Sequence, residues 1–350
     1  MVWTHQPLYS NKMIEDFFYS KIFPKFYIKT KNNQFFALGK KNKLEENCKI
    51  ALFPIFTDDE TFCGVYSPDQ FYFSSNYEIN DCQNFKVKPP INISNDIDYM
   101  SWQKLVEKTK TEIKNGVLKK AVLKRKTSFE FDQPIDQYKY FFRFIKNNPQ
   151  VNHFLFQPDP STTFFGGTPE HLFHRKNEKL RTMALAATIP KNYPIEKLYS
   201  DHKLRKEFQF VKDQLEELLK PFSSKITVSN NSLCHLKTMI HLKCDFEANL
   251  KFIDDIKLIE TFHPTSAILG LPKMTAFEYV KENEPTFRSY YASALGFITP
   301  NESEILVGIR SGIFKENLLH AFAGVGIVEE SNPIEEWKEL NLKLQPIKLW

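Results

Sequence analysis

Three motifs follow one another in the last sixth of the 350-residue chain: Ile309-Arg310-Ser311, then Phe322-Ala323-Gly324-Val325-Gly326-Ile327, then Glu336-Trp337-Lys338-Glu339 with Lys343. They supply a guanidinium group, the backbone amides of a glycine pair, and two carboxylates with a lysine at helical spacing. Neighbouring carboxylates repel each other unless a cation lies between them, and Mg²⁺ favours a few carboxylates together with water and substrate oxygens. The segment therefore contains the groups needed to hold a small polyanion with a divalent metal. Taken alone, the helix is explained equally well as a solvent-exposed C-terminal helix with an acidic start.

The rest of the sequence mixes strand and helix patterns without a regular βαβ alternation. Apolar residues recur at helical spacing from Tyr99, and the predicted helices cover residues 99–114, 136–146, 197–220, 274–283 and a segment from about Pro333. The predicted strands include 153–157 paired with 162–166, and Ala294–Ile298, Glu304–Ile309 and Leu318–Phe322. This mixture predicts an α+β fold, a layered α/β sandwich of large, mainly antiparallel β-sheets flanked by helices.

The composition limits the class of protein. The formal net charge of +5 is mild for this length, and no basic block with interleaved aromatic residues is present, so nucleic-acid binding has little support. No apolar run reaches membrane-spanning length, and the N-terminal residues from Met1 to His5 lack the apolar segment of a signal peptide. The cysteines are odd in number and without a C-x-x-C pair, which favours a reducing compartment; they are Cys48, Cys63, Cys82, Cys234 and Cys244. We expect a cytoplasmic protein with no membrane partner.

Several polar residues are candidates for chemistry, and each also has a simpler structural interpretation. Gly166-Gly167-Thr168-Pro169-Glu170 is interpreted as a glycine turn between two strands that delivers one carboxylate, although a hairpin with an exposed glutamate is commoner. Lys203 and Glu207 are four residues apart in a helix, which by itself predicts a surface salt bridge worth about 0.3–0.5 kcal/mol. Arg310 ends an apolar strand, where it lies either at the sheet rim, the commoner case, or in a pocket that binds a carboxylate.

Other candidates are equally unspecific when each is taken alone. Lys120 precedes the predicted strand Ala121-Val122-Leu123, and a lysine acts as a general base only where its surroundings favour the uncharged amine. His235-Leu236-x-Thr238 and His263-Pro264-Thr265 offer imidazole and hydroxyl groups, but lone histidines are more often structural. The order and spacing of the motifs carry more information than any one of them.

Together, the motifs resemble those of the chorismate-utilising enzymes, and most closely the isochorismate synthase branch of that family. The resemblance covers residues from about 99 to 345, and in family order its segments are Lys120-Ala121-Val122-Leu123-Lys124-Arg125, Gly166-Gly167-Thr168-Pro169-Glu170, Ala184-Leu185-Ala186-Ala187-Thr188, Lys203 to Val211, His235-Leu236-x-Thr238, His263-Pro264-Thr265-Ser266-Ala267, Glu284-Pro285-x-x-Arg288, Arg310-Ser311, Phe322 to Ile327, and Glu336-Trp337-x-Glu339-x-x-x-Lys343.

The branch of the family depends on a few positions. Ammonia-adding members have glutamine in place of Lys120, and the aminodeoxychorismate branch has lysine in place of Ala186, so this chain resembles the branch that adds water. Ala267 and Ile268 resemble the small apolar pair beside the substrate ring in that branch. Ala187 departs from the glycine that is usual in the family: it keeps the N–H that helps to hold a substrate carboxylate, but alanine disfavours a positive φ.

The resemblance implies a reaction and a site. The expected enzyme is an isomerase that converts chorismate to isochorismate by Mg²⁺-dependent addition of water at C2 and loss of the C4 hydroxyl, with menaquinone biosynthesis as the default pathway and siderophore biosynthesis as the second possibility. Lys120 is the implied base that activates water, Glu170 is the implied acid, and Glu207 and Glu339 are the implied Mg²⁺ ligands. The implied substrate-binding residues are Ala187, Thr188, His235, Thr238, Ala267, Ile268, Arg310, Gly324 and Lys343.

The resemblance also sets expectations about organisation and leaves three rival activities open. Residues 1–97, read as short aromatic strands, are expected to be a divergent N-terminal part that completes one globular domain with the chorismate-binding region 98–350. The implied partner is the small molecule chorismate, and the implied state is a monomer. A salicylate synthase, which also eliminates pyruvate, shares nearly all these motifs. An ammonia-adding enzyme and a non-catalytic chorismate-binding paralogue are the second and third rivals.

Overall fold

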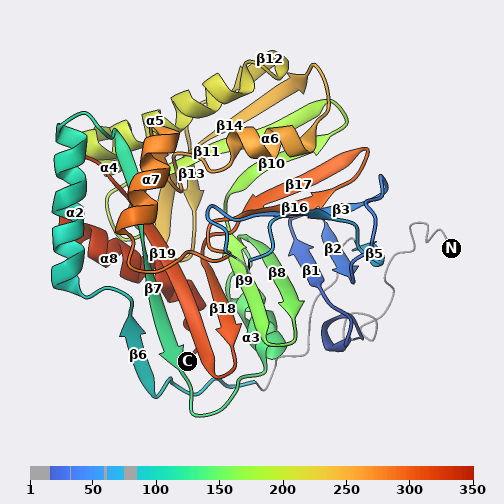
Figure 1. Cartoon of the computed structure of the whole chain (residues 1–350). Helices are drawn as coiled ribbons and strands as arrows, with labels where there is room; N and C mark the ends of the chain where they lie inside the picture. Colours follow the sequence, from blue (N-terminus) through green and yellow to red (C-terminus); the bar gives the residue numbers. More distant parts are fainter. Residues whose placement is uncertain (1–15, 32, 59–60, 75–84) are drawn as a thin grey trace.

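Two large antiparallel β-sheets flanked by helices make up the computed structural model, which describes residues 16–31, 33–58, 61–74 and 85–350 (Figure 1). The predicted α+β class with mainly antiparallel sheets is confirmed. Cys82 and the segment from Met1 to His5, which entered the expectation about the compartment, lie outside the described residues. None of the helices within the described ranges has the length and apolar character needed to cross a membrane.

The first sheet contains ten strands in the order β15-β7-β19-β18-β9-β8-β1-β2-β5, with β6 paired to β7. Its strands are β1 Lys25–Lys29, β2 Gln34–Leu38, β5 Gln70–Ser74, β6 Asn92–Asn95, β7 Lys120–Glu130, β8 Asn152–Asp159, β9 Thr162–Thr168, β15 Gly270–Leu271, β18 Ser311–Lys315 and β19 Leu318–Ile327.

The second sheet contains nine strands in the order β12-β14-β11-β10-β17-β16-β3-β4, with β13 paired to β14. Its strands are β3 Lys49–Phe53, β4 Gly64–Tyr66, β10 His171–Lys176, β11 Lys179–Pro190, β12 Ser223–Val228, β13 Ser232–His235, β14 Met239–Leu250, β16 Ala294–Ile298 and β17 Glu302–Val307. The helices of the described residues include α2 Tyr99–Lys114, α3 Gln137–Asn147, α4 Lys197–Ser200, α5 His202–Leu219, α6 Asp255–Phe262, α7 Lys273–Asn283, α8 Pro333–Leu344 and the 3₁₀-helix η1 Gln345–Ile347.

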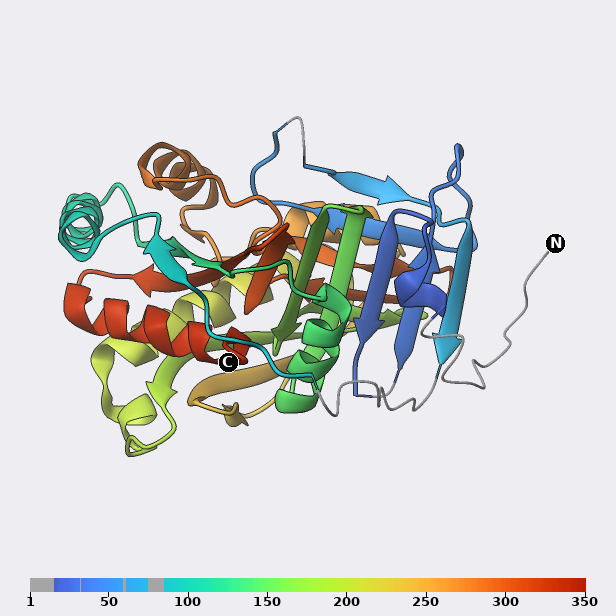
Figure 2. The same cartoon turned by 90° about the horizontal axis from the view of Figure 1, so that it is seen from below.

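Apolar side chains fill two layers. One core cluster joins the two sheets, where the rings of Phe35 on β2 and Phe297 on β16 stack with their centroids 4.6 Å apart. The other core cluster joins the first sheet to α2, α3 and α8 through residues such as Trp102 and Leu340. Figure 2 shows α3 and α8 lying across the strands of the first sheet. The central strands of the first sheet therefore pack against apolar layers on both faces.

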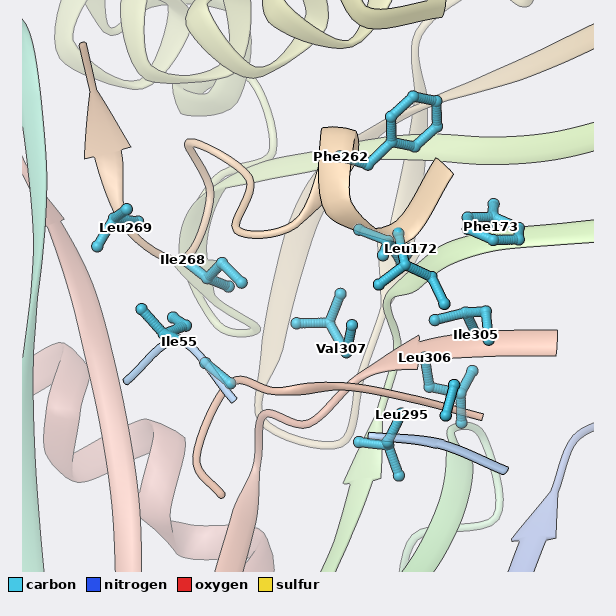
Figure 3. Packing of buried hydrophobic residues seen from close by; sticks show 14 of the residues in the cluster. Ile55, Leu172, Phe173, Phe262, Ile268, Leu269, Leu295, Ile305, Leu306 and Val307 are labelled. Atoms are coloured by element: carbon cyan, nitrogen blue, oxygen red, sulfur yellow. The ribbon is translucent and has the colours of Figure 1, made fainter. Parts of the chain in front are cut away.

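The core between the sheets extends to a segment that later contributes to the site. Figure 3 shows Ile268 and Leu269 near Ile55 and Val307, in the same group of side chains as Leu306. Ile268 and Leu269 are buried, with 4% and 0% of their surfaces exposed. Burial of this kind fixes the position of the backbone as well as the side chains.

Capping side chains explain where several helices begin. Asp98 accepts a hydrogen bond from the backbone N–H of Ser101 at the start of α2, and Asn332 caps α8 just before Pro333. The helix predicted over 197–220 is divided into α4 and α5. The reason is Asp201, which has an extended backbone and caps a new helix by accepting a hydrogen bond from the N–H of Leu204.

The strands at the C-terminal end differ from the prediction in two ways that matter for the site. The strand predicted over Leu318–Phe322 continues to Ile327 as β19, and β18 was not predicted. β18 pairs only with the first half of β19, from Leu318 to Phe322, whereas β7 pairs with all of it. The second half of β19, which contains the glycine pair, therefore has one edge that no strand among the described residues of this sheet covers.

Gly166 and Gly167 were predicted to form a turn, and this prediction was wrong because both lie inside β9. Neither has a positive φ. A Cβ at Gly166 would collide with the ring of Phe154, and a Cβ at Gly167 would lie 2.9 Å from Phe144. The glycines allow close packing of aromatic rings against the strand, and only Pro169 and Glu170 form the connection to β10.

The N-terminal strands are distributed over both sheets. β1, β2 and β5 extend the first sheet beyond β8, and β3 and β4 extend the second sheet beyond β16. β1 pairs with β8 over five residues, and β3 pairs with β16 over five residues. The described part of residues 1–97 thus continues sheets whose central strands come from the rest of the chain.

Candidate active site

Most of the residues selected from the sequence line one cavity, between the second half of β19, β7, β11, β14 and α5. The structure brings together nine of them at this cavity: Lys120, Glu170, Thr188, Glu207, Ala267, Ile268, Arg310, Gly324 and Lys343. Glu339 is placed next to it, because its carboxylate forms an ion pair with Lys343 over 2.7 Å.

Lys120 is the first residue of β7 and is fully buried. Its Nζ donates a hydrogen bond to Glu207 Oε1 on α5 over 3.2 Å. Gly326 makes this contact possible, because a Cβ at that position would lie 2.6 Å from both Glu207 Oε1 and Lys120 Cε. Burial alone would raise the pKa of Glu207, but Lys120, Lys203 and Lys343 lower it, so Glu207 is a carboxylate.

Glu170 follows β9 and is buried at the same cavity. Burial raises the pKa of its carboxyl group to about 7, and the positive charges of Lys120, Lys343 and Arg310 limit the rise. Its backbone N–H donates to Thr168 Oγ1 over 3.2 Å, which fixes the start of the connection. A carboxyl group with this pKa is protonated in a large fraction of molecules near neutral pH and is suited to donate a proton.

Arg310 lies in the cavity and not at the sheet rim. It connects β17 to β18 with a positive φ of 52°, and 6% of its surface is exposed. Its Nη2 donates to His241 Nε2 over 3.1 Å. The other ring nitrogen, Nδ1, is 2.9 Å from Thr188 Oγ1. The cavity therefore contains a buried guanidinium that is oriented by a histidine.

The open edge of β19 faces Lys343 at Gly324. Gly324 is opposite Lys124 of β7, but the N–H of Lys124 donates instead to Glu284 Oε1 over 2.8 Å. The carbonyl oxygen of Gly324 accepts a hydrogen bond from Lys343 Nζ over 2.7 Å. In an antiparallel pair of this kind both backbone groups of a residue point away from the partner strand. The N–H of Gly324 therefore faces the open edge, where it is available to an anion.

Three glutamates surround Lys203 near the cavity. Burial alone would lower the pKa of Lys203, but the carboxylates of Glu336, Glu207 and Glu339 raise it. Glu336 is buried and accepts a hydrogen bond from Lys203 Nζ. Burial raises the pKa of Glu336 to about 7, with Lys203 opposing the rise and Glu339 adding to it. The predicted salt bridge between Lys203 and Glu207 at helical spacing is thus replaced by contacts with other elements. Lys203 pairs with Glu336 on α8, and Glu207 pairs with Lys120 on β7.

The acidic residues fit Mg²⁺ as part of a complex with substrate. Over the described ranges of the chain, no three acidic, histidine or cysteine side chains are grouped closely enough to hold a metal by themselves. Glu207 and Glu339 each face a lysine, over 3.2 Å and 2.7 Å. Mg²⁺ is commonly bound by one or two carboxylates together with water and substrate oxygens, and this donor set matches that requirement.

Three predicted substrate-binding residues do not line the cavity. His235 ends β13 with an exposed side chain, and Thr238 borders a small separate cavity that also touches Arg310. Ala187 is buried and lies between Ala186 and Thr188, which do line the cavity. It forms a β-bulge between β11 and β14 and has a φ of 57°. This is the positive φ that alanine disfavours, at a position where the family usually has glycine.

A buried ion pair supports the apolar side of the cavity. Arg288 donates two hydrogen bonds to the carboxylate of Glu284, over 2.8 and 2.6 Å. The same guanidinium donates to the carbonyl oxygens of Ile268 and Val122, both of which line the cavity. The motif Glu284-Pro285-x-x-Arg288 therefore joins two walls, although no role could be assigned to it from the sequence.

His241 and Gly326 are two residues of the site that the sequence reasoning missed. His241 lies in β14 between Ile240 and Leu242, and all three are buried. A strand that is buried on both faces has no alternation of polar and apolar residues, so no pattern distinguishes His241 from a structural histidine. Gly326 lies in the quoted glycine pair, but its contact with Lys120 depends on the pairing of β7 with β19.

Comparisons with known proteins identify the family of the chain. A family model described as "Chorismate binding enzyme" matches residues 69–349, and the chain therefore belongs to the chorismate binding enzymes. Isochorismate synthase MenF of Haemophilus influenzae is 35% identical over 251 residues, which cover 69% of this chain and 58% of that protein. Isochorismate synthase MenF of Escherichia coli is 30% identical over 254 residues, covering 70% and 59%. The chain matches about three fifths of the length of these curated relatives.

Solved structures show the same fold. The structure of the menaquinone-specific isochorismate synthase MenF from Escherichia coli has a TM-score of 0.83 at 22% identity, covering 95% of this chain and 89% of that chain. A structure described as the putative 2,3-dihydroxybenzoate-specific isochorismate synthase DhbC from Bacillus anthracis has a TM-score of 0.85 at 24% identity, covering 97% and 98%.

Proposed function

We propose that the protein is an isomerase that converts chorismate to isochorismate. The observation that carries this proposal is one cavity lined by Lys120 and Glu170 in a chain that belongs to the chorismate binding enzymes. Relatives named isochorismate synthase, at 35% and 30% identity, support the same activity. Ala186 also lines the cavity, and the combination of Lys120 with Ala186 supports water as the added nucleophile.

The reaction needs a base and an acid. Water adds at C2 while the hydroxyl group at C4 departs and the double bonds shift between them. Water is a weak nucleophile, so it must lose a proton as it attacks. Hydroxide is a poor leaving group, so the departing hydroxyl must gain a proton. Lys120 takes a proton from the attacking water, and Glu170 gives a proton to the departing oxygen, which leaves as water. Lys120 donates to Glu207 in the structure, so this contact must be exchanged for a contact with water during the reaction.

The electrostatics of Glu170 support its role as the acid. Burial holds the pKa of its carboxyl group at about 7, so the protonated form is available at neutral pH. After the reaction the proton lost by Glu170 and the proton gained by Lys120 are both exchanged with water. No net proton is consumed, as an isomerisation requires.

The charged groups around the cavity support binding of a dianion. Arg310 and Lys343 line the cavity, and the N–H of Gly324 faces the open edge of β19, so three donors are available to the two carboxylates of chorismate. Glu207 and Glu339 would hold Mg²⁺, which supplies positive charge next to the ring carboxylate. The remaining ring surface would lie against Ala267 and Ile268, whose side chains form an apolar wall.

The setting of the enzyme is part of the proposal. Curated relatives named MenF, and the similar Escherichia coli structure described as menaquinone-specific, support menaquinone biosynthesis as the pathway. We further infer a cytoplasmic monomer in which residues 1–97 and 98–350 form one domain.

The test is identification of the product. The purified protein is incubated with chorismate and Mg²⁺, and the mixture is separated by chromatography. We expect isochorismate, with no salicylate, pyruvate or amino product. Release of pyruvate would identify a salicylate synthase, and an ammonium-dependent product would identify an ammonia-adding enzyme. Tight binding of chorismate in calorimetry without any product would identify a non-catalytic binding protein.

A further inference from the structure

Three side chains form a hydrogen-bonded line along one side of the cavity. Thr188 Oγ1 is 2.9 Å from His241 Nδ1, and His241 Nε2 is 3.1 Å from Arg310 Nη2. Thr188 comes from β11, His241 from the neighbouring strand β14, and Arg310 from the connection between β17 and β18. All three line the cavity. The line therefore couples two groups that could touch a ligand through a histidine between them.

The chemistry of arginine fixes the direction of every hydrogen bond in this line. A guanidinium group has only donors, so His241 Nε2 must accept. A neutral imidazole with an accepting Nε2 carries its proton on Nδ1, and this N–H must donate to Thr188 Oγ1. The hydroxyl oxygen of Thr188 then accepts, which leaves the Thr188 hydroxyl hydrogen free to donate to another group.

The surroundings exclude the other protonation states of His241. An imidazole protonated on Nε2 would direct its hydrogen at the guanidinium hydrogens of Arg310. A doubly protonated imidazolium would place a second positive charge beside Arg310 in a buried position, where 5% of the histidine surface is exposed. Burial, Arg310 and Lys343 all lower the pKa of His241. The imidazole is therefore neutral.

We propose that His241 is a positioning residue, which orients Arg310 and makes Thr188 a hydrogen-bond donor, so that both present hydrogens to a carboxylate group in the cavity. This inference rests on the proposed function, because the anionic ligand is chorismate. His241 itself need not touch the substrate. It acts through Arg310, which it orients, and through Thr188, whose hydroxyl it makes a hydrogen-bond donor toward the substrate.

Arg310 has few other supports. Its Nη2 also lies 3.9 Å from the sulfur of Met239, which is a weak acceptor. Within the described residues, no other hydrogen bond holds the guanidinium group. Removing the acceptor at His241 should therefore release the orientation of Arg310 without removing its charge.

Three substitutions separate the two bonds. In His241→Gln the amide oxygen reaches the place of Nε2 and still accepts from Arg310. In His241→Asn the shorter amide lies near Nδ1 and still donates to Thr188 but does not reach Arg310. His241→Phe keeps a ring and loses both bonds. The matched control is His320→Asn, which alters a hydroxyl–imidazole pair of the same kind, Ser128 Oγ and His320 Nδ1 at 2.8 Å; this pair lies on parts of β7 and β19 that do not line the cavity.

Steady-state kinetics with chorismate and calorimetric binding of chorismate provide the readout. We expect His241→Phe to raise KM and Kd by about tenfold to a hundredfold, the loss of a charge-assisted hydrogen bond, while kcat changes less than about threefold. His241→Gln should recover most of the affinity, and His320→Asn should match the unmodified enzyme. An unchanged KM in His241→Phe, or a large fall in kcat at constant KM, would overturn the proposal.

A second measurement does not depend on turnover. Two-bond ¹H–¹⁵N correlation spectra of the histidine side chains, with His241 assigned by its absence in His241→Gln, report the protonated nitrogen directly. We expect the neutral Nδ1–H form between pH 6 and 8. The Nε2–H form or an imidazolium would refute the inferred polarity, even if the variants were unstable. If the enzyme neither binds nor converts chorismate, the proposed function fails, and these spectra still decide the polarity of the line.

Discussion

Lys120 Nζ and Glu207 Oε1 are 3.2 Å apart, and this contact joins the proposed base to a proposed metal ligand. The two residues are 87 positions apart in sequence, on β7 and α5. Their side chains are 1% and 16% exposed, so little water screens the pair. The proposed proton-transfer group and the proposed cation-binding group are thus neighbours, and a change at one is expected to affect the other.

Gly326→Ala should disable the enzyme without unfolding it. The new Cβ would lie 2.6 Å from Glu207 Oε1 and Lys120 Cε, so the pair must separate. Because a displacement of about 1 Å in a catalytic group can cost about a hundredfold in rate, we expect a loss of at least that size in kcat/KM. Gly312→Ala on β18 is the control, since its Cβ would meet Leu319 at 2.9 Å. Equal losses in both variants would argue against a specific effect on the pair.

Lys120→Ala should abolish formation of isochorismate while chorismate still binds. The amine is the only group assigned to activate water, whereas the binding donors Arg310, Lys343 and Gly324 remain. Product formation and calorimetric binding are measured side by side. Lys119→Ala, which changes the adjacent exposed lysine, should behave as the unmodified enzyme. Normal turnover in Lys120→Ala would remove Lys120 from the mechanism.

The pH dependence of kcat/KM should reflect the carboxyl group of Glu170. Its pKa is raised to about 7 by burial, and the acid must be protonated, so kcat/KM should fall as the pH rises above about 7. Glu170→Gln should have no measurable turnover, because an amide cannot replace the acid. A full rate in this variant would exclude Glu170.

The same substitution should stabilise the protein at alkaline pH. A carboxyl group whose pKa is raised from 4.5 to about 7 on folding costs no stability below pH 4.5 and destabilises the folded state progressively up to about pH 7. The shift corresponds to about 3 kcal/mol at 1.36 kcal/mol per pKa unit. In urea unfolding at pH 8, the free energy of unfolding of Glu170→Gln should therefore be higher than that of the unmodified protein by an amount of this order. At pH 4 the two free energies of unfolding should be equal. An equal difference at both pH values would contradict the ionisation as its cause.

Removal of divalent metal should stop the reaction reversibly. EDTA leaves Glu207, Glu339 and the anionic substrate without a shared cation, and added Mg²⁺ should restore the rate. In a thermal unfolding assay with chorismate present, Mg²⁺ should raise the Tm of the unmodified protein but not that of Glu339→Gln. Glu335→Gln is the control, because Glu335 is exposed on the same helix and pairs with Lys338. Full activity in EDTA would rule out the metal.

Ala187→Gly should stabilise the protein. Ala187 has a φ of 57°, which costs an L-residue about 1–2 kcal/mol, and glycine loses about 0.5–1 kcal/mol through its greater freedom when unfolded. We expect a net gain of about 0.5–1 kcal/mol in urea unfolding. Ala184→Gly, in the same strand without a positive φ, should destabilise. If both variants lose stability, the bulge is not strained.

Much of the fold could be predicted because its signals are local. The apolar spacing from Tyr99 predicted α2, and Ala294–Ile298 was predicted with the bounds of β16. The packing reasons for Gly166 and Gly167 were out of reach, since the rings of Phe154 and Phe144 approach them only through strand pairing and helix packing. Both a turn and a tightly packed strand require glycine, so a pair of glycines does not distinguish one from the other.

The candidate site was also predicted only in part. The ordered motifs predicted the groups that line the cavity, such as Lys120, Glu170 and Arg310, because the resemblance depends on those residues. Partners could not be predicted: Lys203 bonds Glu336 from another helix, and Arg310 bonds His241. These contacts depend on where α5, α8 and β14 lie in space, and spacing along the chain does not contain that information.

The N-terminal strands cover one edge of β8 in the first sheet and one edge of β16 in the second. β1 covers β8, and β3 covers β16, so a chain shortened to begin near Tyr99 would expose two long unpaired edges, one on each sheet. Unpaired edge strands recruit the edges of other molecules. We infer that such a fragment would retain every residue that lines the cavity and still be lost to aggregation, so gene fusions and minimal versions of this protein must keep these strands, none of which lines the cavity.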